Sequence, residues 1–204
     1  MSDEQRIAEL IADFEDFDDG VRDTAKTELI AIGEPAIPQL VDALAHDLWD
    51  IVEQAADALK AIGVPAIPIL MGELEIAERH LGLAIASTLA RIGEPAIPAL
   101  IKVLSNEVNE ELREYAVRAF TGMGVKAKSA IPALIQALSD PEEEVRTYAA
   151  YALGKIEAAA ADAVPALVKA LTDESERVQE HAVFALDKIG NQEAQAALKA
   201  FIQA

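Results

Sequence analysis

Apolar residues recur along this chain with the spacing of amphipathic helices. They occupy positions i, i+3, i+4 and i+7, which lie on one face of a helix. Six segments share this pattern, and a further copy follows them. The matching positions are Ile7, Leu10, Ile11, Phe14; Ile37, Leu40, Val41, Leu44; Ile67, Leu70, Met71, Leu74; Ile97, Leu100, Ile101, Leu104; Ile131, Leu134, Ile135, Leu138; Val164, Leu167, Val168, Leu171; and, in the last copy, Ala194, Ala197, Leu198, Phe201. Each segment predicts a helix with one buried face.

A second apolar pattern follows each of the first six segments, and its copies also align. Its core positions are Ala25, Leu29, Ile32; Ala55, Leu59, Ile62; Ile85, Leu89, Ile92; Ala116, Phe120, Met123; Ala149, Leu153, Ile156; and Ala182, Leu186, Ile189. Successive copies are 30 to 33 residues apart. The two patterns together predict six helical hairpins over residues 3–33, 34–63, 64–93, 94–124, 125–157 and 158–190, with a capping helix over 191–204.

Short segments rich in glycine and proline separate the hairpins. "GEPAIP" stands at 33–38 and again at 93–98, and "GVPAIP" stands at 63–68. The glycine can adopt the left-handed conformation that ends a helix, and the prolines suit the first turn of the next helix. Eight of the nine prolines fall at such starts, and Pro141 falls in the turn of the fifth hairpin. Because an interior proline costs about 3 kcal/mol, the prolines mark helix boundaries.

Hairpins that repeat at this period stack side by side, since one hairpin alone cannot bury both of its apolar faces. The predicted fold is therefore all-α: an α-solenoid of about six stacked helical hairpins with a C-terminal capping helix, forming a single domain over residues 1–204. The composition agrees, because 52% of the residues are hydrophobic and only 4% are aromatic, which suits closely packed helices.

Two strings carry a resemblance to a known family: "KSAIPALIQALSDPEEEVRTYAAYALGKI" and "ADAVPALVKALTDESERVQEHAVFALDKIG". They resemble the short HEAT-like repeats named after phycobilisome lyases, and the resemblance covers nearly the whole chain. The arginine that the family places early in the second helix is present as Arg22, Arg113 and Arg146. The corresponding residues in the other hairpins are Val52, Gly82 and Gln179. The resemblance implies the fold, and it leaves the activity open because such repeats serve in many scaffolds.

Charge and composition exclude several classes of partner and chemistry. The 36 acidic and 17 basic residues give a formal net charge of −19, which disfavours binding to nucleic acid or anionic membranes. The charge favours a basic partner or simply maintains solubility. No cysteine is present, which removes thiolate chemistry and agrees with a reducing cytoplasm. The acidic N-terminal segment does not resemble a signal peptide, and the apolar stretches are too short to span a bilayer.

No combination of residues indicates a catalytic or metal site. The three histidines, His46, His80 and His181, belong to the second, third and sixth hairpins, so no two of them are expected to share a metal. One branch of HEAT-like proteins hydroxylates a modified lysine with a di-iron site built from His-Glu pairs, and no His-Glu pair occurs here. The many carboxylates are more typical of solvated helix faces than of a general acid and base pair. The sequence therefore predicts no catalytic residues and no metal.

Carboxylates gather opposite the apolar stripe of the second helices. They are Asp19, Asp23, Glu53, Glu110, Glu114, Glu143, Glu176 and Glu180. Second helices line the concave face in proteins of this type, so we expect an acidic groove there. The alternative is a hydrated surface without a partner.

Aromatic residues form a neighbouring column in the last three hairpins: Tyr115, Tyr148, Tyr151, His181 and Phe184, with Arg118 in the position equivalent to Tyr151 and Phe184. Such rings either bind a partner side chain or planar ligand, or fill the gaps between repeats. Trp49, the only tryptophan, begins the second helix of the second hairpin, and the pattern predicts that it is exposed.

Two functions remain open. The first is a non-enzymatic scaffold or adaptor that binds a basic or mixed protein partner in the acidic groove, with the aromatic residues as anchors and without a cofactor. The second follows from the family resemblance: a phycobilin lyase-like or chromophore-handling protein that binds a bilin or a phycobiliprotein subunit, in a branch whose members often act as heterodimers, with Arg118 and the rings around the pigment.

Overall fold

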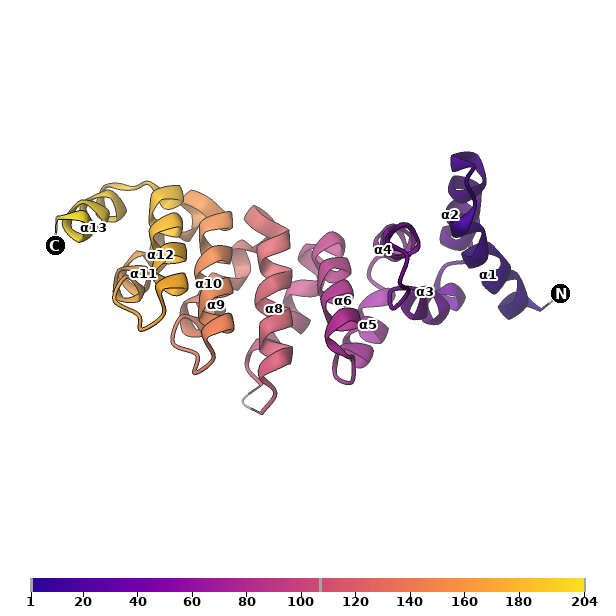
Figure 1. The fold of residues 1–204 in the computed structure, drawn as a ribbon, viewed down its shortest axis with the longest axis horizontal. Coiled ribbons are helices and arrows are strands. Elements are labelled where there is room, and N and C mark those ends of the chain that lie inside the picture. Colours follow the sequence, from indigo (N-terminus) through magenta and orange to yellow (C-terminus); the bar gives the residue numbers. More distant parts are fainter. Residues whose placement is uncertain (1, 107, 204) are drawn as a thin grey trace. The chain divides into compact units, whose positions relative to one another are not determined.

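The computed structural model describes residues 2–106 and 108–203, and in this part of the chain every regular element is a helix (Figure 1). The first helices of the hairpins are α1 (Asp3–Ala12), α3 (Ile37–Ala43), α5 (Ala66–Leu74), α7 (Ile97–Leu104), α9 (Ile131–Ala137) and α11 (Val164–Ala170). The second helices are α2 (Asp19–Ile32), α4 (Trp49–Ile62), α6 (Arg79–Ile92), α8 (Glu110–Met123), α10 (Glu143–Ile156) and α12 (Glu176–Ile189). A last helix, α13 (Gln192–Ile202), follows. The predicted all-α hairpin repeat is confirmed.

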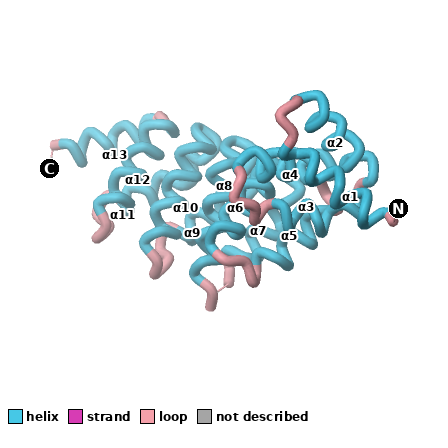
Figure 2. The backbone as a smooth tube through the Cα atoms, turned by 45° about the vertical axis from the view of Figure 1, so that its right-hand side comes forward, coloured by secondary structure: helices cyan, strands magenta, loops and turns pink. Residues whose placement is uncertain are grey.

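The chain divides into two compact units, an N-terminal unit (Met1–Ala96) and a C-terminal unit (Ile97–Ala204). In the N-terminal unit, α4 packs between α2 and α6, and α3 packs against α1 and α5. In the C-terminal unit, α10 packs between α8 and α12, and α7, α9 and α11 form a second layer beside them (Figure 2). Each unit is therefore a stack of hairpins with first helices in one layer and second helices in the other.

Each segment between hairpins begins with a residue of positive φ, and all of them except the one after Gly63 continue into a 3₁₀ turn. Gly33 has φ 73° and ψ −131°, and the 3₁₀ turn Glu34–Ala36 follows directly. The glycines were expected to adopt the left-handed helical conformation, and Gly190 does, with φ 64° and ψ 7°. At Gly33 the prediction is wrong, because φ is positive but ψ is extended. At both glycines the amide donates to the carbonyl four residues earlier, Gly33 to Leu29 and Gly190 to Leu186, so the extended ψ changes only the direction in which the chain leaves the helix.

The core consists of the aligned apolar positions, most of which are buried as predicted. Leu29, Leu59 and Leu89 on the second helices are completely buried, as is Leu40 on α3. Two predictions are wrong: Val168 on α11 and Phe201 on α13 are exposed by 38% and 37%. Both lie among the last three helices that the structure describes.

Candidate functional site

Four rings form a row on the second helices of the C-terminal unit. Tyr148 and Tyr151 lie almost one turn apart on α10, so they share a face of that helix. His181 and Phe184 have the same spacing on α12. The ring of Tyr151 meets the His181 ring edge-on at 5.1 Å and the Phe184 ring at 5.3 Å and 57°. We call Tyr148, Tyr151, His181 and Phe184 the ring row.

Arg118 on α8 connects to the ring row through Tyr148. Its guanidinium carbon lies 3.9 Å from the centre of the Tyr148 ring, which is a cation–π contact. Its Nε atom donates a hydrogen bond to Oε1 of Glu114 at 2.6 Å, one helical turn earlier on α8. The hydrogen bond to Glu114 therefore holds the guanidinium of Arg118 over the Tyr148 ring.

The four rings are each half-buried, so part of every ring faces solvent. Tyr115 differs, because only 1% of its surface is exposed. Glu114 is also buried, at 6% exposure. The prediction that Glu114 faces an open groove is therefore wrong: α8 packs against both α7 and α10, and positions 114 and 115 are covered in this packing. For Tyr115, the alternative of filling a gap between repeats holds.

The position of Phe184 depends on a glycine that sequence reasoning missed. A Cβ atom on Gly154 of α10 would lie 2.6 Å from Cε1 of Phe184 and 3.0 Å from Cα of Ala185. The phenyl ring thus lies directly on the backbone of α10. A glycine in the middle of an otherwise regular helix is the signal that could have indicated this contact.

Carboxylates border the ring row, and some already have partners. Glu110, Glu143 and Glu180 are exposed. Oε1 of Glu143 accepts a hydrogen bond from Oγ of Ser175 at 2.8 Å and lies 3.6 Å from Nη1 of Arg177. A hydrogen bond to Glu144 and the charge of that carboxylate raise the pKa of Arg177. The surface around the rings is therefore acidic, and Arg177 offsets part of its negative charge.

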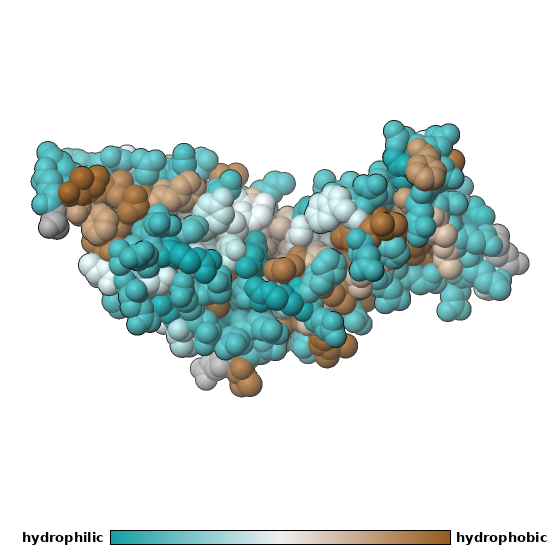
Figure 3. Space-filling model, in the orientation of Figure 1, coloured by the Kyte–Doolittle hydropathy of each residue, from teal (hydrophilic) through white to brown (hydrophobic). Residues whose placement is uncertain are grey.

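Figure 3 shows the hydropathy of one face of the C-terminal unit. On the face drawn there, residues of intermediate hydropathy, shown pale, gather over α8 and α10, and hydrophilic residues surround them. The partly exposed rings and the exposed carboxylates Glu110, Glu143 and Glu180 lie on the second helices of this unit. Such an arrangement resembles the anchor and rim of a protein interface.

The two remaining predicted site residues belong to the N-terminal unit. Trp49 is 70% exposed, as the pattern predicted. Glu53 pairs with Arg91 of α6, whose Nη2 lies 2.5 Å from Oε1 of Glu53 and whose Nη1 lies 2.9 Å from Oδ1 of Asp57. Burial lowers the pKa of Arg91, but the hydrogen bonds and charges of the two carboxylates raise it more. Glu53 thus links α4 to α6.

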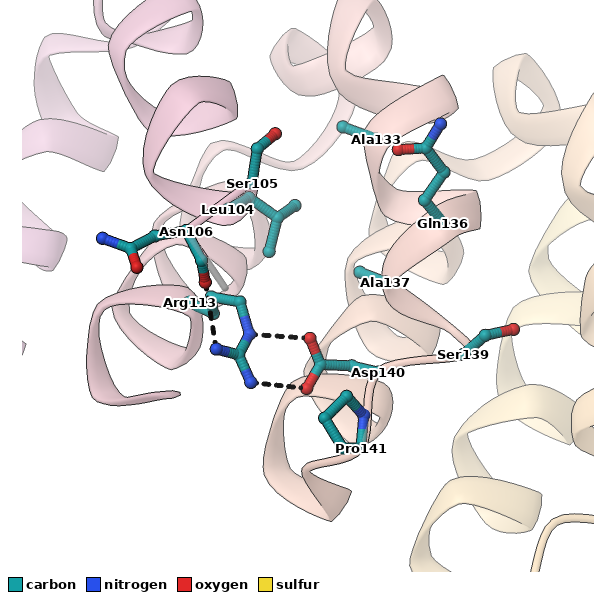
Figure 4. A pocket seen from close by; sticks show the side chains of 10 residues that line it. All are labelled: Leu104, Ser105, Asn106, Arg113, Ala133, Gln136, Ala137, Ser139, Asp140 and Pro141. Carbon is teal, nitrogen blue, oxygen red and sulfur yellow. Dashed lines mark hydrogen bonds and ion pairs between the residues drawn. The ribbon is translucent and has the colours of Figure 1, made fainter. Parts of the chain in front are cut away.

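A hollow of about 450 Å³ opens between α7 and α9 in the C-terminal unit (Figure 4). Arg113 lies at its base and donates from Nε and Nη2 to both oxygens of Asp140 at 2.8 and 2.9 Å, and from Nη1 to the carbonyl of Asn106 at 3.0 Å. The Asp140 hydrogen bonds raise the pKa of Arg113, against an opposing effect of burial. Because these contacts join successive turns, we assign this arginine to structure.

In residues 2–106 and 108–203, no three or more histidine, aspartate or glutamate side chains lie close enough together to hold a metal ion. None of the helices described is both long and apolar enough to cross a membrane. The ring row and Arg118 together form the candidate binding site.

Comparisons with known sequences support the repeat assignment. The family model described as HEAT repeats matches residues 97–162 and 131–204, which together make up more than half of the chain. The family model described as PBS lyase HEAT-like repeat matches residues 83–106. None of the curated protein sequences matches.

Several solved structures have a similar fold. The complex of CpcE and CpcF of phycocyanin lyase from Nostoc sp. PCC7120 has a TM-score of 0.58 and 20% identity, covering 74% of this chain and 98% of that one. YIBA of E. coli has a TM-score of 0.50 and 18% identity, covering 98% and 75%. An engineered protein gives 0.48 and 24%, covering 97% and 98%. At these identities the likeness concerns the fold alone.

Proposed function

Because the chain belongs to the family of HEAT repeats, of the PBS lyase-like type, we propose that it is a protein-binding scaffold whose ring row and Arg118 contact the partner. The observation that carries this proposal is the partial exposure of four rings on α10 and α12, which contact one another or Arg118 of α8. Exposed Glu110, Glu143 and Glu180 border the rings, which favours a basic or mixed partner. A scaffold of this kind needs no cofactor, and its lack of cysteine suits the cytoplasm.

Rings held in this way are suited to binding for a thermodynamic reason. Aromatic side chains and arginine dominate the residues that contribute most to protein interfaces. Association normally costs entropy because side chains become ordered, at roughly 0.5–1.5 kcal/mol for each mobile one. Tyr151 and Phe184 are already ordered by their mutual contact, and Arg118 by Glu114. The surface therefore loses little further freedom when a partner covers it.

The test is a pull-down from soluble lysate of the source organism with three forms of the protein, each at low and high salt. The forms are the intact chain, the variant Tyr148→Ala/Tyr151→Ala/Phe184→Ala, and the control Phe201→Ala, which removes an exposed ring outside the ring row. We expect a basic protein that the intact chain and the control retain at low salt. Equal retention by the triple variant, with helicity confirmed by circular dichroism, would contradict the proposal.

A second candidate function is supported by the PBS lyase-like repeat and by the fold likeness to a phycocyanin lyase complex. In this case the partner would be a phycobiliprotein subunit or a second lyase-like chain in a heterodimer, and an open-chain tetrapyrrole would lie on the rings. The Arg118 guanidinium over Tyr148 would then face the propionates. Titration with a free bilin distinguishes the two functions, because only pigment binding changes the visible absorption spectrum.

A further inference from the structure

Large apolar side chains are exposed in the hairpin turns of the N-terminal unit. Phe17 in the first turn is 102% exposed, Leu48 and Trp49 in the second are 51% and 70% exposed, and Ile76 in the third is 79% exposed. None of the four is part of the buried face of a helix. We call them the apolar turn edge.

These turns occupy the same place in three successive hairpins of the N-terminal unit. The helices α2, α4 and α6 begin at residues 19, 49 and 79, and α4 packs between the other two. The first two turns are in direct contact, because Nε2 of His46 lies 3.8 Å from Oε1 of Glu15. The exposed side chains therefore recur near the start of the second helix from one hairpin to the next.

The fourth hairpin also exposes an apolar residue in its turn, Val108 at 95%, but the fifth and sixth hairpins show that the fold does not require such residues. In the fifth and sixth hairpins the residue before the helix cap is Pro141 and Glu174, and their turns expose no large apolar side chain among the residues that the structure describes. The same type of turn is thus built from polar residues or proline elsewhere. The apolar side chains of the N-terminal unit contribute nothing evident to its folding.

Carboxylates surround the apolar turn edge. Asp16 and Asp18 flank Phe17, Asp47 and Asp50 flank Leu48 and Trp49, and Glu75 and Glu78 flank Ile76. Residues 1–96 hold 20 of the 36 acidic residues of the chain but only 6 of its 17 basic residues. A partner that covers the apolar side chains must therefore also approach a strongly negative surface.

We propose that the apolar turn edge binds a basic amphipathic segment of a protein partner, with apolar side chains over Phe17, Trp49 and Ile76 and lysines or arginines facing the carboxylates. Burial of large apolar side chains supplies affinity, and complementary charge supplies speed and selectivity of association. An anionic membrane surface is disfavoured because its charge has the same sign. This surface involves none of the ring-row residues, so it does not depend on the function proposed above.

Trp49 provides the measurement, because it is the only tryptophan in the chain. The probes are a synthetic amphipathic peptide of leucine and lysine and its counterpart of leucine and glutamate. We expect a saturable blue shift of Trp49 fluorescence with the lysine peptide and none with the glutamate peptide. Phe17→Ser and Ile76→Ser should each weaken binding about tenfold, in line with the affinity that burial of one such side chain contributes. Raising the salt concentration should weaken binding further.

Two control variants make the outcome specific. Val64→Ser removes an exposed apolar side chain at the opposite end of α4, and Tyr148→Ala/Tyr151→Ala/Phe184→Ala removes the ring row. Both should bind the lysine peptide as the intact chain does. The proposal is overturned if the lysine peptide produces no shift, if the glutamate peptide produces the same shift, or if Phe17→Ser and Val64→Ser bind equally well. A blue shift with phosphatidylcholine vesicles instead of the peptide would assign the edge to a membrane and also overturn it.

Discussion

Arg146 holds both carboxylate oxygens of Asp173, which lies 27 residues later in the turn of the next hairpin. Nε donates to Oδ2 at 2.9 Å and Nη2 to Oδ1 at 3.0 Å, while Nη1 donates to the carbonyls of Asp140 and Pro141, each at 2.9 Å. Arg113 donates to both carboxylate oxygens of Asp140 in the same way, so hydrogen bonds join each of the last three hairpin turns to the next.

Replacing only one partner of the Arg146–Asp173 pair should strongly destabilise the C-terminal unit. Arg146 is 7% exposed, and replacing Asp173 with leucine leaves its buried charge with only Glu174, at 3.4 Å, as an acidic partner. Such a loss costs about 3–5 kcal/mol, whereas replacing both partners with apolar residues is far less costly. We expect Asp173→Leu to lower the free energy of unfolding in urea by that amount and Arg146→Leu/Asp173→Leu to restore much of it. Asp162→Leu, at an exposed carboxylate, is the control, and an equal effect there would contradict the argument.

The same pair predicts the response to acid. Burial raises the pKa of Asp173, but hydrogen bonds from Arg146 and from the Ser175 amide, together with the charge of Arg146, lower it more, so its pKa is below the ordinary 3.8. A lowered pKa in the folded state means that the stabilisation is complete above about pH 4 and is lost as the pH falls through the folded-state pKa. Asp173→Asn should therefore be destabilised at pH 7 and show a smaller further loss on acidification below pH 4. Thermal unfolding at each pH measures both effects, and identical pH profiles for the two proteins would refute the assignment.

The fold could be predicted from the sequence because its signals are local. Apolar spacing identified both helices of every hairpin, and the prolines marked the starts. Burial at individual positions depends on neighbours that spacing does not describe, so Val168 and Phe201 were assigned to the core although they are exposed. The prediction of a single domain over 1–204 stays a prediction.

The candidate site was predicted less completely, for a related reason. The helical angle placed Tyr115 and Glu114 near the surface, but the angle takes no account of how closely α8 and α10 pack. The contact of Arg118 with Tyr148 joins two hairpins, and no pattern within either hairpin indicates it. Phe17 and Ile76 were overlooked because they fall outside both helical patterns, although their positions in polar turns were visible.

Glu157 offers a stabilising substitution. It ends α10 with φ 62° and ψ −142°, and it is the only residue other than glycine with positive φ in the described part of the chain. A side chain in this conformation costs about 1–3 kcal/mol. Glu157→Gly should therefore raise the free energy of unfolding by about 1 kcal/mol after the greater flexibility of unfolded glycine is included. Ala158→Gly, one residue away, should instead lower it, and a loss in both variants would show that position 157 is not strained.

Gly154 and Phe184 provide a test of how the ring row is held in place. In Gly154→Ala the new methyl group would lie 2.6 and 2.7 Å from Cε1 and Cδ1 of Phe184, so the ring or the two helices must move. We expect a loss of about 1–3 kcal/mol, as for other overpacked cores, and a weaker Tyr151–Phe184 contact. Gly154→Ala/Phe184→Leu should recover part of the stability because the ring is gone. The control is Gly72→Ala on α5, where a methyl group meets no atom within 4 Å and should stabilise the helix by about 0.5–1 kcal/mol. If Gly154→Ala behaves like Gly72→Ala in urea unfolding, the ring of Phe184 does not rest on the α10 backbone, and the ring row is less rigid than its proposed binding role requires.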